Sequence, residues 1–351
     1  MEKKLRLIGL TRNKLFAYIG GIIIAILLPL VLKGSYTQHV LCMILVWAIV
    51  GMGWNFIGGY AGQVSIGHSV FYAIGAYTVA LGFQFFKITP WITIWIGILI
   101  SVIIAFMIGM PLLRLKGHYF AVASMAVAES MRVIFVNWKW IGGATGVDFL
   151  NKKVNPWLAI QFPQKYQYYY LFLLVVVLIL ALTILLDRSK FGFYLRTIKG
   201  NEQAAESVGI DTTKYKSLAY MLSAAIVSIG GSLYAQYMLY IDPSMLMQLR
   251  ISLLICLVCV MGGIGTVLGP IIGAIIMTVI SEYTRVAIGG SGKGVDQILY
   301  GVIVIVIVLF LPNGILSLFT VLRKGKRPNN ETTKPTFSDP SSPAPTLNAR
   351  D

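Results

Sequence analysis

Charge is scarce in this 351-residue sequence. Asp, Glu, Lys and Arg together make up 12% of it, whereas 57% of the residues are hydrophobic and the mean hydropathy is +0.78. Because soluble domains carry about 25% charged residues, this composition excludes an ordinary soluble protein. The apolar runs are long and continuous rather than alternating, which favours membrane-spanning helices that satisfy their own backbone hydrogen bonds.

Residues that catalyse reactions or bind metals are also scarce. The 3 histidines are scattered without a partner pattern, and the 3 cysteines lie in apolar runs. Cys256-x-x-Cys259 has metal-like spacing but no second pair, so we interpret it as packing within the membrane. The nearest sequence to a phosphate-binding loop, 289–294, lacks the first glycine and the Ser or Thr of that motif. We expect no metal, cofactor or nucleotide on this chain; ATP and magnesium would belong to a partner.

The apolar stretches predict an all-α, polytopic transmembrane helical bundle of about ten spans, since a bilayer core needs roughly 20 apolar residues per helix. Stretch 64–83 contains a histidine, glycines and serines, so we expect a full span or a broken, re-entrant helix. Stretch 250–263 is short, and the same two alternatives hold for it. The predicted spans are 15–32, 40–57, 64–83, 91–113, 119–136, 168–186, 215–237, 250–263, 267–288 and 295–311.

The basic residues set a predicted orientation. With both termini in the cytoplasm, most of the 29 Lys and Arg residues fall on cytoplasmic segments. The net charge of +16 then reflects topology and contact with anionic membrane lipid, and we expect no nucleic acid.

The same orientation divides the chain into three parts. They are a basic cytoplasmic N-terminus, 1–14; a transmembrane domain, 15–318, with an uncleaved first helix; and a cytoplasmic tail, 319–351. The tail is rich in Pro, Ser, Thr and Asn, which predicts disorder.

A polar segment, 187–214, interrupts the apolar chain and is predicted to be cytoplasmic. Within it, Gly200 and Asn201 precede a short helical run, 202–208. Gly209 follows where a left-handed C-cap glycine belongs. The order of these signals indicates more than a plain connector.

The two faces of this predicted short helix differ. Glu202 and Glu206 share one side at i,i+4, whereas Ala204 and Ala205 leave a small, smooth face. A helix this short is marginal by itself in water, so we predict that the alanine face docks into a groove of a partner.

Two glycine-rich segments, 58–77 and 261–276, stand next to predicted spans. Small residues allow close helix packing, or a helix break whose backbone groups bind polar solutes. Both interpretations stay open, and the second predicts that one or both segments line a translocation path. The candidate path residues of the first segment are Gly62, Gln63, Ser65, Gly67 and His68.

Charges inside the spans form two similar pairs. Glu129 and Arg132 are three residues apart, as are Glu282 and Arg285, so each pair shares a helical face and its members can neutralise each other. Ionisable residues in a membrane often face a cavity. Each pair is therefore either a structural intrahelical ion pair or part of a path for a polar solute.

Four stretches together make the chain resemble the M-type permease subunit of the branched-chain amino acid ABC importers. The third stretch has Ala144-Thr145 where that family more often has Pro-Asn, and the polar tail is not part of the family pattern. The resemblance covers 40–318, and the four stretches are 59–77, 115–132, 142–146 and 192–225.

The last stretch carries the coupling loop of that family, whose pattern is Glu-Ala-Ala-x-x-x-Gly. Glu202, Ala204, Ala205 and Gly209 fill these positions, with Gln203 inserted. The resemblance implies that this loop contacts an ATPase subunit and transmits its motion.

The resemblance also implies the partners and the location. It implies pairing with a second, H-type permease, two ATPase subunits and an extracytoplasmic solute-binding protein, in the cell membrane. This chain would be a transport subunit and not an enzyme, since ATP hydrolysis would occur on the partner.

Three alternatives to this function differ in what they require of the sequence. Relatives of this family carry urea or short amides, so the solute stays open. An ion-coupled secondary transporter would need an ion-binding carboxylate, for which Glu129 is the candidate. A membrane enzyme lacks any nucleophile or metal constellation in this sequence.

Overall fold

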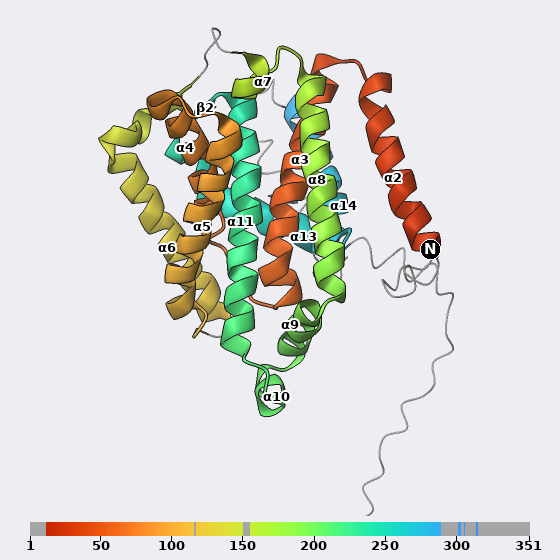
Figure 1. Ribbon diagram of the computed structural model, residues 1–351, viewed down its shortest axis with the longest axis vertical. Helices are drawn as coiled ribbons and strands as arrows, with labels where there is room; N and C mark the ends of the chain where they lie inside the picture. Colours follow the sequence, from red (N-terminus) through yellow and green to blue (C-terminus); the bar gives the residue numbers. More distant parts are fainter. Residues whose placement is uncertain are drawn as a thin grey trace, which may run out of the picture.

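Long apolar helices lie side by side through most of the chain (Figure 1). The computed structural model describes residues 12–115, 117–149, 155–288 and 301, 302, 305 and 314. Within these residues, 7 helices are long and apolar enough to cross a membrane, and two further apolar helices are shorter. The prediction of an all-α, polytopic membrane protein is confirmed. The predicted span 295–311 and the tail 319–351 lie outside the described residues.

Each predicted span from 15–32 to 267–288 has a helix in its place. The long helices are α2 (Arg12–Val31), α3 (Ser35–Trp54), α4 (Ser69–Phe86), α5 (Pro90–Leu112), α6 (His118–Asn137), α8 (Lys165–Arg188), α11 (Thr212–Met238), α13 (Leu249–Gly262) and α14 (Gly269–Ile288).

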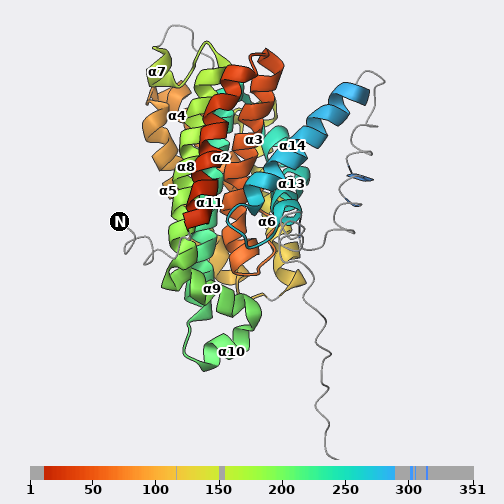
Figure 2. The same cartoon turned by 90° about the vertical axis from the view of Figure 1, so that its right-hand side faces the viewer.

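Short elements occupy the two ends of the bundle. One end carries α9 (Lys190–Gly200), α10 (Glu202–Ser207) and the π-helix η1 (Asn55–Tyr60) that continues α3. The opposite end carries α7 (Pro156–Ala159) (Figures 1 and 2). The remaining elements are η2 (Lys139–Ile141), η3 (Gly143–Thr145), α12 (Pro243–Leu246), and the antiparallel strands β1 (Val147–Asp148) and β2 (Tyr240–Ile241).

Helix α11 is the central helix, packed between α3, α4 and α5. Small residues bring its backbone close to its neighbours: a Cβ added at Gly75 of α4 would collide with the carbonyl of Ser228, and one at Gly231 with the carbonyl of Tyr72. The Ser232 hydroxyl donates to the carbonyl of Gly75 at 3.0 Å. Glycine at these positions is therefore required by packing, as is usual where membrane helices approach closely.

The first glycine-rich segment is a break between two helices. α3 and its π-helix end at Tyr60, the following residues are irregular, and α4 begins only at Ser69. The break lies near the middle of the bundle, because His68 contacts Ser223, about 16 Å along α11 from Thr212 at 1.5 Å per residue. Of the predicted span 64–83, the first five residues are irregular and the rest belongs to α4, which is itself long and apolar enough to cross a membrane, so both alternatives for this span stay open.

Helix α13 also begins inside the bundle. By itself it has 14 residues, which span about 21 Å and fall short of the roughly 30 Å of a bilayer core. The candidate span counted above is Pro243–Gly262, which includes α12 as well as α13. Its Ser252 hydroxyl donates to the Ser69 hydroxyl at 2.8 Å and accepts from the Ser69 N–H at 3.1 Å. The N-termini of α4 and α13 therefore meet at one depth inside the bundle.

We expect Gly75→Ala to destabilise the bundle by about 1–3 kcal/mol, because the added methyl group forces α4 away from α11. The thermal unfolding midpoint of the purified protein in detergent measures this. Gly21→Ala in α2 is the matched control, since nothing lies within 4 Å of a Cβ added there. An equal midpoint for both variants would show that the α4–α11 contact tolerates a side chain.

Candidate functional site

The short helix α10 forms as its sequence predicts. The Asn201 side chain caps it by accepting from the Ala204 N–H at 3.1 Å. The helix ends at Ser207, and Gly209 follows with a φ of +84°, the left-handed conformation that glycine adopts without strain. Gly200, just before the cap, has open space where a side chain would be. The predicted helix and its terminating glycine are confirmed, and the structure adds the Asn201 cap.

Both acids of α10 are bound to the start of α11. Glu202 forms an ion pair with Lys216, Nζ to Oε1 2.5 Å, and the Lys216 side chain is only 2% exposed. The Thr212 hydroxyl donates to Glu206 at 2.7 Å. These two bonds attach α10 to the central helix of the bundle, so a displacement of α10 reaches α11 directly.

Ala204 and Ala205 do not share a face. Ala205 is fully buried within the chain, whereas Ala204 is exposed. Adjacent residues on a helix point about 100° apart, and Ala205 lies beside Glu202 and Glu206 on the side turned toward α11. The predicted alanine docking face is therefore wrong for Ala205. The outward face instead carries Ala204 and Val208, and Val208 is 72% exposed.

Helix α9 ties the polar segment to the helix break. The Lys199 ammonium donates to the carbonyl of Gly59 at 2.8 Å, and burial lowers the pKa of Lys199 below its usual value. Gly62 has a φ of +74°, and a Cβ there would lie 2.9 Å from the Lys199 side chain. The α9–α10 segment therefore contacts both α11 and the residues that follow α3.

A buried hydrogen-bond network fills the helix break. The two ring nitrogens of His68 bond to the hydroxyls of Ser65, at 2.9 Å, and of Ser223 on α11, at 2.8 Å. The Ser65 carbonyl accepts from the indole N–H of Trp54 at 2.8 Å. Ser65 and His68 are 0% exposed, so they hold α4 and α11 together and do not line an open passage in this conformation. Their role in the path stays a prediction.

The same break packs against α6. The N–H of Ile66 donates to the Ser124 hydroxyl at 2.9 Å, and a Cβ added at Gly67 would collide with the Ser124 carbonyl. Gln63 is 9% exposed. Gly67 is thus needed for close approach, and the break positions α6 as well as α4.

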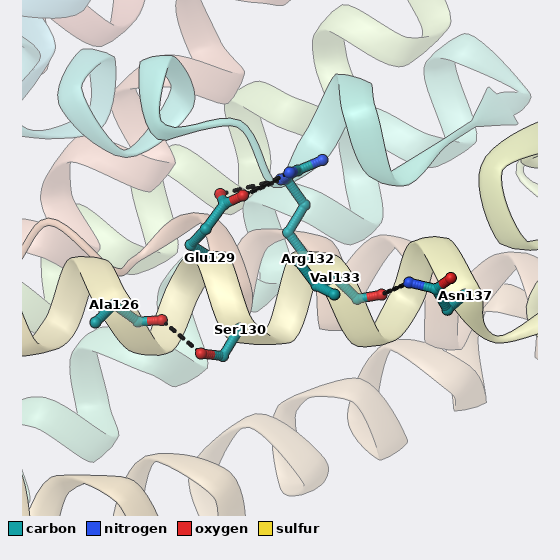
Figure 3. A network of polar contacts seen from close by, with 6 residues as sticks. All are labelled: Ala126, Glu129, Ser130, Arg132, Val133 and Asn137. Atoms are coloured by element: carbon teal, nitrogen blue, oxygen red, sulfur yellow. Dashed lines mark hydrogen bonds and ion pairs between the residues drawn. The ribbon is translucent and has the colours of Figure 1, made fainter.

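Glu129 and Arg132 form an ion pair along α6, as predicted (Figure 3). The guanidinium donates to both carboxylate oxygens, with Nε at 3.0 Å from each. The two side chains are 51% and 30% exposed. Glu129 also lines a 270 Å³ pocket with Met247 and Leu249, at the start of α13. The pair therefore lies beside the start of α13 and is partly exposed.

The second predicted pair is only partly described. Glu282 accepts a hydrogen bond from the Tyr36 hydroxyl at 3.0 Å, while the side chain of Arg285 lies outside the described residues. Glu282 thus has a partner on α3 that the sequence spacing did not indicate.

Sequence reasoning missed several residues of these contacts. Lys216 and Ser223 lie on α11, and Lys199 lies on α9. A lysine in a polar segment is normally solvated, and no local pattern shows that residue 216 is buried. A serine 155 positions from His68 carries no local signal either.

Comparison with known proteins identifies what the chain resembles. Residues 36–311 match the family model described as branched-chain amino acid transport system, permease component. No solved structure matches the chain.

Curated relatives carry the same description. The high-affinity branched-chain amino acid transport system permease protein LivM of Salmonella typhimurium is 27% identical over 330 residues, which cover 88% of this chain and 76% of the relative. LivM of Escherichia coli is 26% identical over 329 residues with the same coverages. A probable branched-chain amino acid transport permease protein LivH of Methanocaldococcus jannaschii is 29% identical over 138 residues, or 38% of this chain and 43% of the relative.

We expect Glu202→Gln to loosen the polar segment, because it leaves the buried Lys216 ammonium without its counter-charge. The double variant Glu202→Gln/Lys216→Met should recover most of the loss, with a coupling energy of about 0.5–3 kcal/mol. The rate of tryptic cleavage within 187–214, on membranes that expose this segment, measures the effect.

Asp187→Asn is the matched control. It breaks the ion pair of Asp187 with Arg196, whose side chain is 53% exposed, and exposed pairs contribute little. Equal cleavage of Glu202→Gln and the unmodified protein would contradict a structural role for the buried pair.

Proposed function

Because the chain belongs to the family of branched-chain amino acid transport permease components, we propose that it is the membrane-spanning subunit of an ATP-driven importer of branched-chain amino acids. The relatives that it matches over most of its length are permease proteins of such transport systems. The observation that carries the ATP-driven part is the attachment of α10 to α11.

The geometry of α10 suits a helix on which an ATPase subunit exerts force. It projects from the end of the bundle opposite α7 (Figure 1), and its acids are bound to Lys216 and Thr212 of α11. Force on α10 is transmitted by an ion pair and a hydrogen bond to α11, and from Ser223 of α11 to His68 at the helix break. Closure of an ATPase dimer against α10 then tilts the central helix and switches access across the membrane.

The surface that meets the ATPase subunit is the outward side of α9 and α10. Ala204 is exposed there, Val208 is 72% exposed and Phe193 of α9 is 64% exposed. Large apolar side chains next to a small residue suit a shallow groove on a partner. Other residues of the segment position this surface without forming it, by ending α10 or by binding it to α11. They are Gly200, Glu202, Ala205, Glu206 and Gly209.

The proposed assembly contains a second permease. This chain is similar to LivM proteins over most of its length and to LivH proteins over about two-fifths of it, and both kinds are permease proteins. An H-type permease, two ATPase subunits that hold ATP and magnesium, and an extracytoplasmic solute-binding protein complete the importer. This chain catalyses no reaction itself and binds no cofactor.

The proposed location is the cell membrane, with α10 on the cytoplasmic side. The bias of Lys and Arg supports this orientation and cytoplasmic termini. The boundaries 1–14, 15–318 and 319–351, with the coupling loop 187–214, are proposed on the same basis.

The translocation path is proposed to run along α6. Within α6 only Phe120, Ser124 and Ala128 are buried, so the opposite side of the helix has no partner among the described residues. Glu129 is exposed and Arg132 is half-buried in the middle of this span, and charges at that depth are costly when they face lipid. They therefore face a second subunit, an aqueous path, or both. The residues of the helix break contribute to the proposed path indirectly, because they position α6 and α4. They are Gly62, Gln63, Ser65, Gly67 and His68.

The alternative of an ion-coupled transporter has no support in the geometry. Glu129 is the candidate ion ligand for such a transporter. Both of its carboxylate oxygens accept hydrogen bonds from the Arg132 guanidinium, so the charge of Glu129 is already compensated. No contact among the described residues favours urea or a short amide over an amino acid.

We expect Ala204→Glu to insert normally but to lose co-purifying ATPase subunit and solute uptake, because it places a charge on the docking surface without touching the interior. The measurement is a pull-down from membranes beside leucine uptake. Ala204→Ser is the matched control and should behave as the unmodified protein. Full ATPase recovery with full uptake in Ala204→Glu would contradict the coupling role of α10.

We expect either single neutralisation, Glu129→Gln or Arg132→Gln, to lower the amount of protein in the membrane, because each leaves a lone charge at mid-span. The double variant should recover the level, yet its uptake should stay at least tenfold below normal if the pair contacts the solute path. Immunoblots of membranes and leucine uptake measure the two effects.

Ser130→Ala is the control on the same helix, since that hydroxyl donates only to the carbonyl of Ala126 at 2.8 Å (Figure 3). Normal uptake by the double variant would leave the Glu129–Arg132 pair a structural one.

A further inference from the structure

A pocket of about 410 Å³ lies beside the start of α13, walled by α3, α11, α12, α13 and α14. Its volume falls within the range of small-ligand sites, roughly 300–1,000 Å³. It extends from Arg250, next to the junction of α13 with α4, to His39 and Met238 near the end of the bundle opposite α10. In the proposed orientation the pocket therefore extends toward the side from which an imported solute arrives.

Arg250 brings a positive charge into the pocket. It stands two residues before Ser252, which bonds to Ser69, so it lies at the depth of the helix break. Arg250 is exposed, and its guanidinium has no hydrogen-bond or ion-pair partner among the described residues. An arginine at this depth is costly unless it meets an anion or water.

The N-terminus of α13 adds to this positive field. Gln248 precedes the helix without a side-chain cap, and Gln248, Arg250 and Ile251 all line the pocket. The N–H groups of a first helical turn point outward and favour a bound anion. A carboxylate in the pocket would thus meet both a guanidinium and a helix N-terminus.

Thr278 of α14 supplies an independent sign of a ligand. Its side chain lines the pocket and is 5% exposed, and its hydroxyl has no hydrogen-bond partner within the part of the chain that the structure describes. Buried hydroxyls are almost always paired, so an orphan at a pocket wall indicates a polar group that occupies the pocket.

The pocket also carries a negative group and an apolar wall. Glu282, one turn after Thr278 on α14, lines the pocket and is held by the Tyr36 hydroxyl. Met43, Trp47 and Leu254 line it as well. Separate positive and negative groups beside an apolar wall match a small zwitterion with an aliphatic side chain.

We propose that this pocket binds the transported amino acid directly, with the α-carboxylate at Arg250 and the start of α13, the α-ammonium at Glu282, and the aliphatic side chain against Met43, Trp47 and Leu254. Thr278 donates or accepts a hydrogen bond with the bound head group. The inference rests on the proposed function and gives this chain a solute site of its own, separate from the one on a binding protein.

The test uses the whole transporter complex in detergent, without ATP or binding protein. Ser244, exposed and lining the pocket, is changed to cysteine, and its labelling by a membrane-impermeant maleimide is followed. The complex with unchanged Ser244 gives the background from the native cysteines. Leucine should slow the labelling, while leucinamide, without a carboxylate, and 4-methylpentanoate, without an ammonium, should not.

Variants in the Ser244→Cys background assign the groups. Arg250→Gln should raise the half-protecting concentration of leucine at least tenfold and abolish the distinction between leucine and leucinamide. Thr278→Val should raise it about threefold or more. Thr183→Val is the matched control, because Thr183 is equally buried in α8 and donates to the carbonyl of Ile179 at 2.8 Å; it should not change the protection.

The outcomes separate the inference from the function on which it rests. Absence of leucine uptake by the unmodified complex would overturn the proposed function. Normal uptake without leucine protection, or equal protection in Arg250→Gln and Ser244→Cys alone, would overturn the pocket assignment and leave the function intact. Protection by added phosphatidylethanolamine but not by leucine would assign a lipid head group and also overturn it. If Arg250→Gln does not assemble, Thr278→Val and the leucine analogues decide the question.

Discussion

The close approach of α11 to its neighbours is the constraint on which the rest of the structure depends. Gly75 and Gly231 let the backbones of α4 and α11 touch, and Ser232 bonds across the same contact. With no hydrophobic effect between helices in lipid, such contacts are what hold a membrane bundle together. Because α11 is fixed against α3, α4 and α5, everything attached to it, from α10 at one end to Tyr234 beside the pocket at the other, is positioned by this packing.

A second level of organisation comes from helices that start inside the bundle. The N-termini of α4 and α13 meet through Ser69 and Ser252, and the irregular residues before α4 satisfy their polar groups within the protein. Non-helical backbone at membrane depth is tolerated only where protein or water surrounds it. The break therefore joins helices and also brings polar groups into an apolar bundle. Two charged residues lie near the start of α13, Glu129 in one pocket and Arg250 in another.

The sequence predicted what depends on local pattern. Continuous apolar runs located the helices, the short run 202–208 with Gly209 after it located α10, and the spacing of Glu129 and Arg132 predicted their ion pair. It could not predict contacts between distant residues, such as His68 with Ser223.

The same limit explains the misplaced docking face. Which side of α10 turns inward is decided by a lysine 14 positions from Glu202, so the burial of Ala205 followed only from the folded structure. The pocket was missed for that reason as well, because its wall is assembled from five helices and its residues share no pattern in the sequence.

The His68–Ser223 hydrogen bond joins α11 to the residue just before α4 at a point between the two ends of α11. The helix is 27 residues long, or about 40 Å, and the bond divides it into arms of about 16 Å toward α10 and 22 Å toward Met238. In the proposed coupling, a tilt of α11 about this bond, together with the helices packed on it, would move its two ends in opposite directions. The end at Met238 would move farther than the end at α10, because it lies farther from the bond.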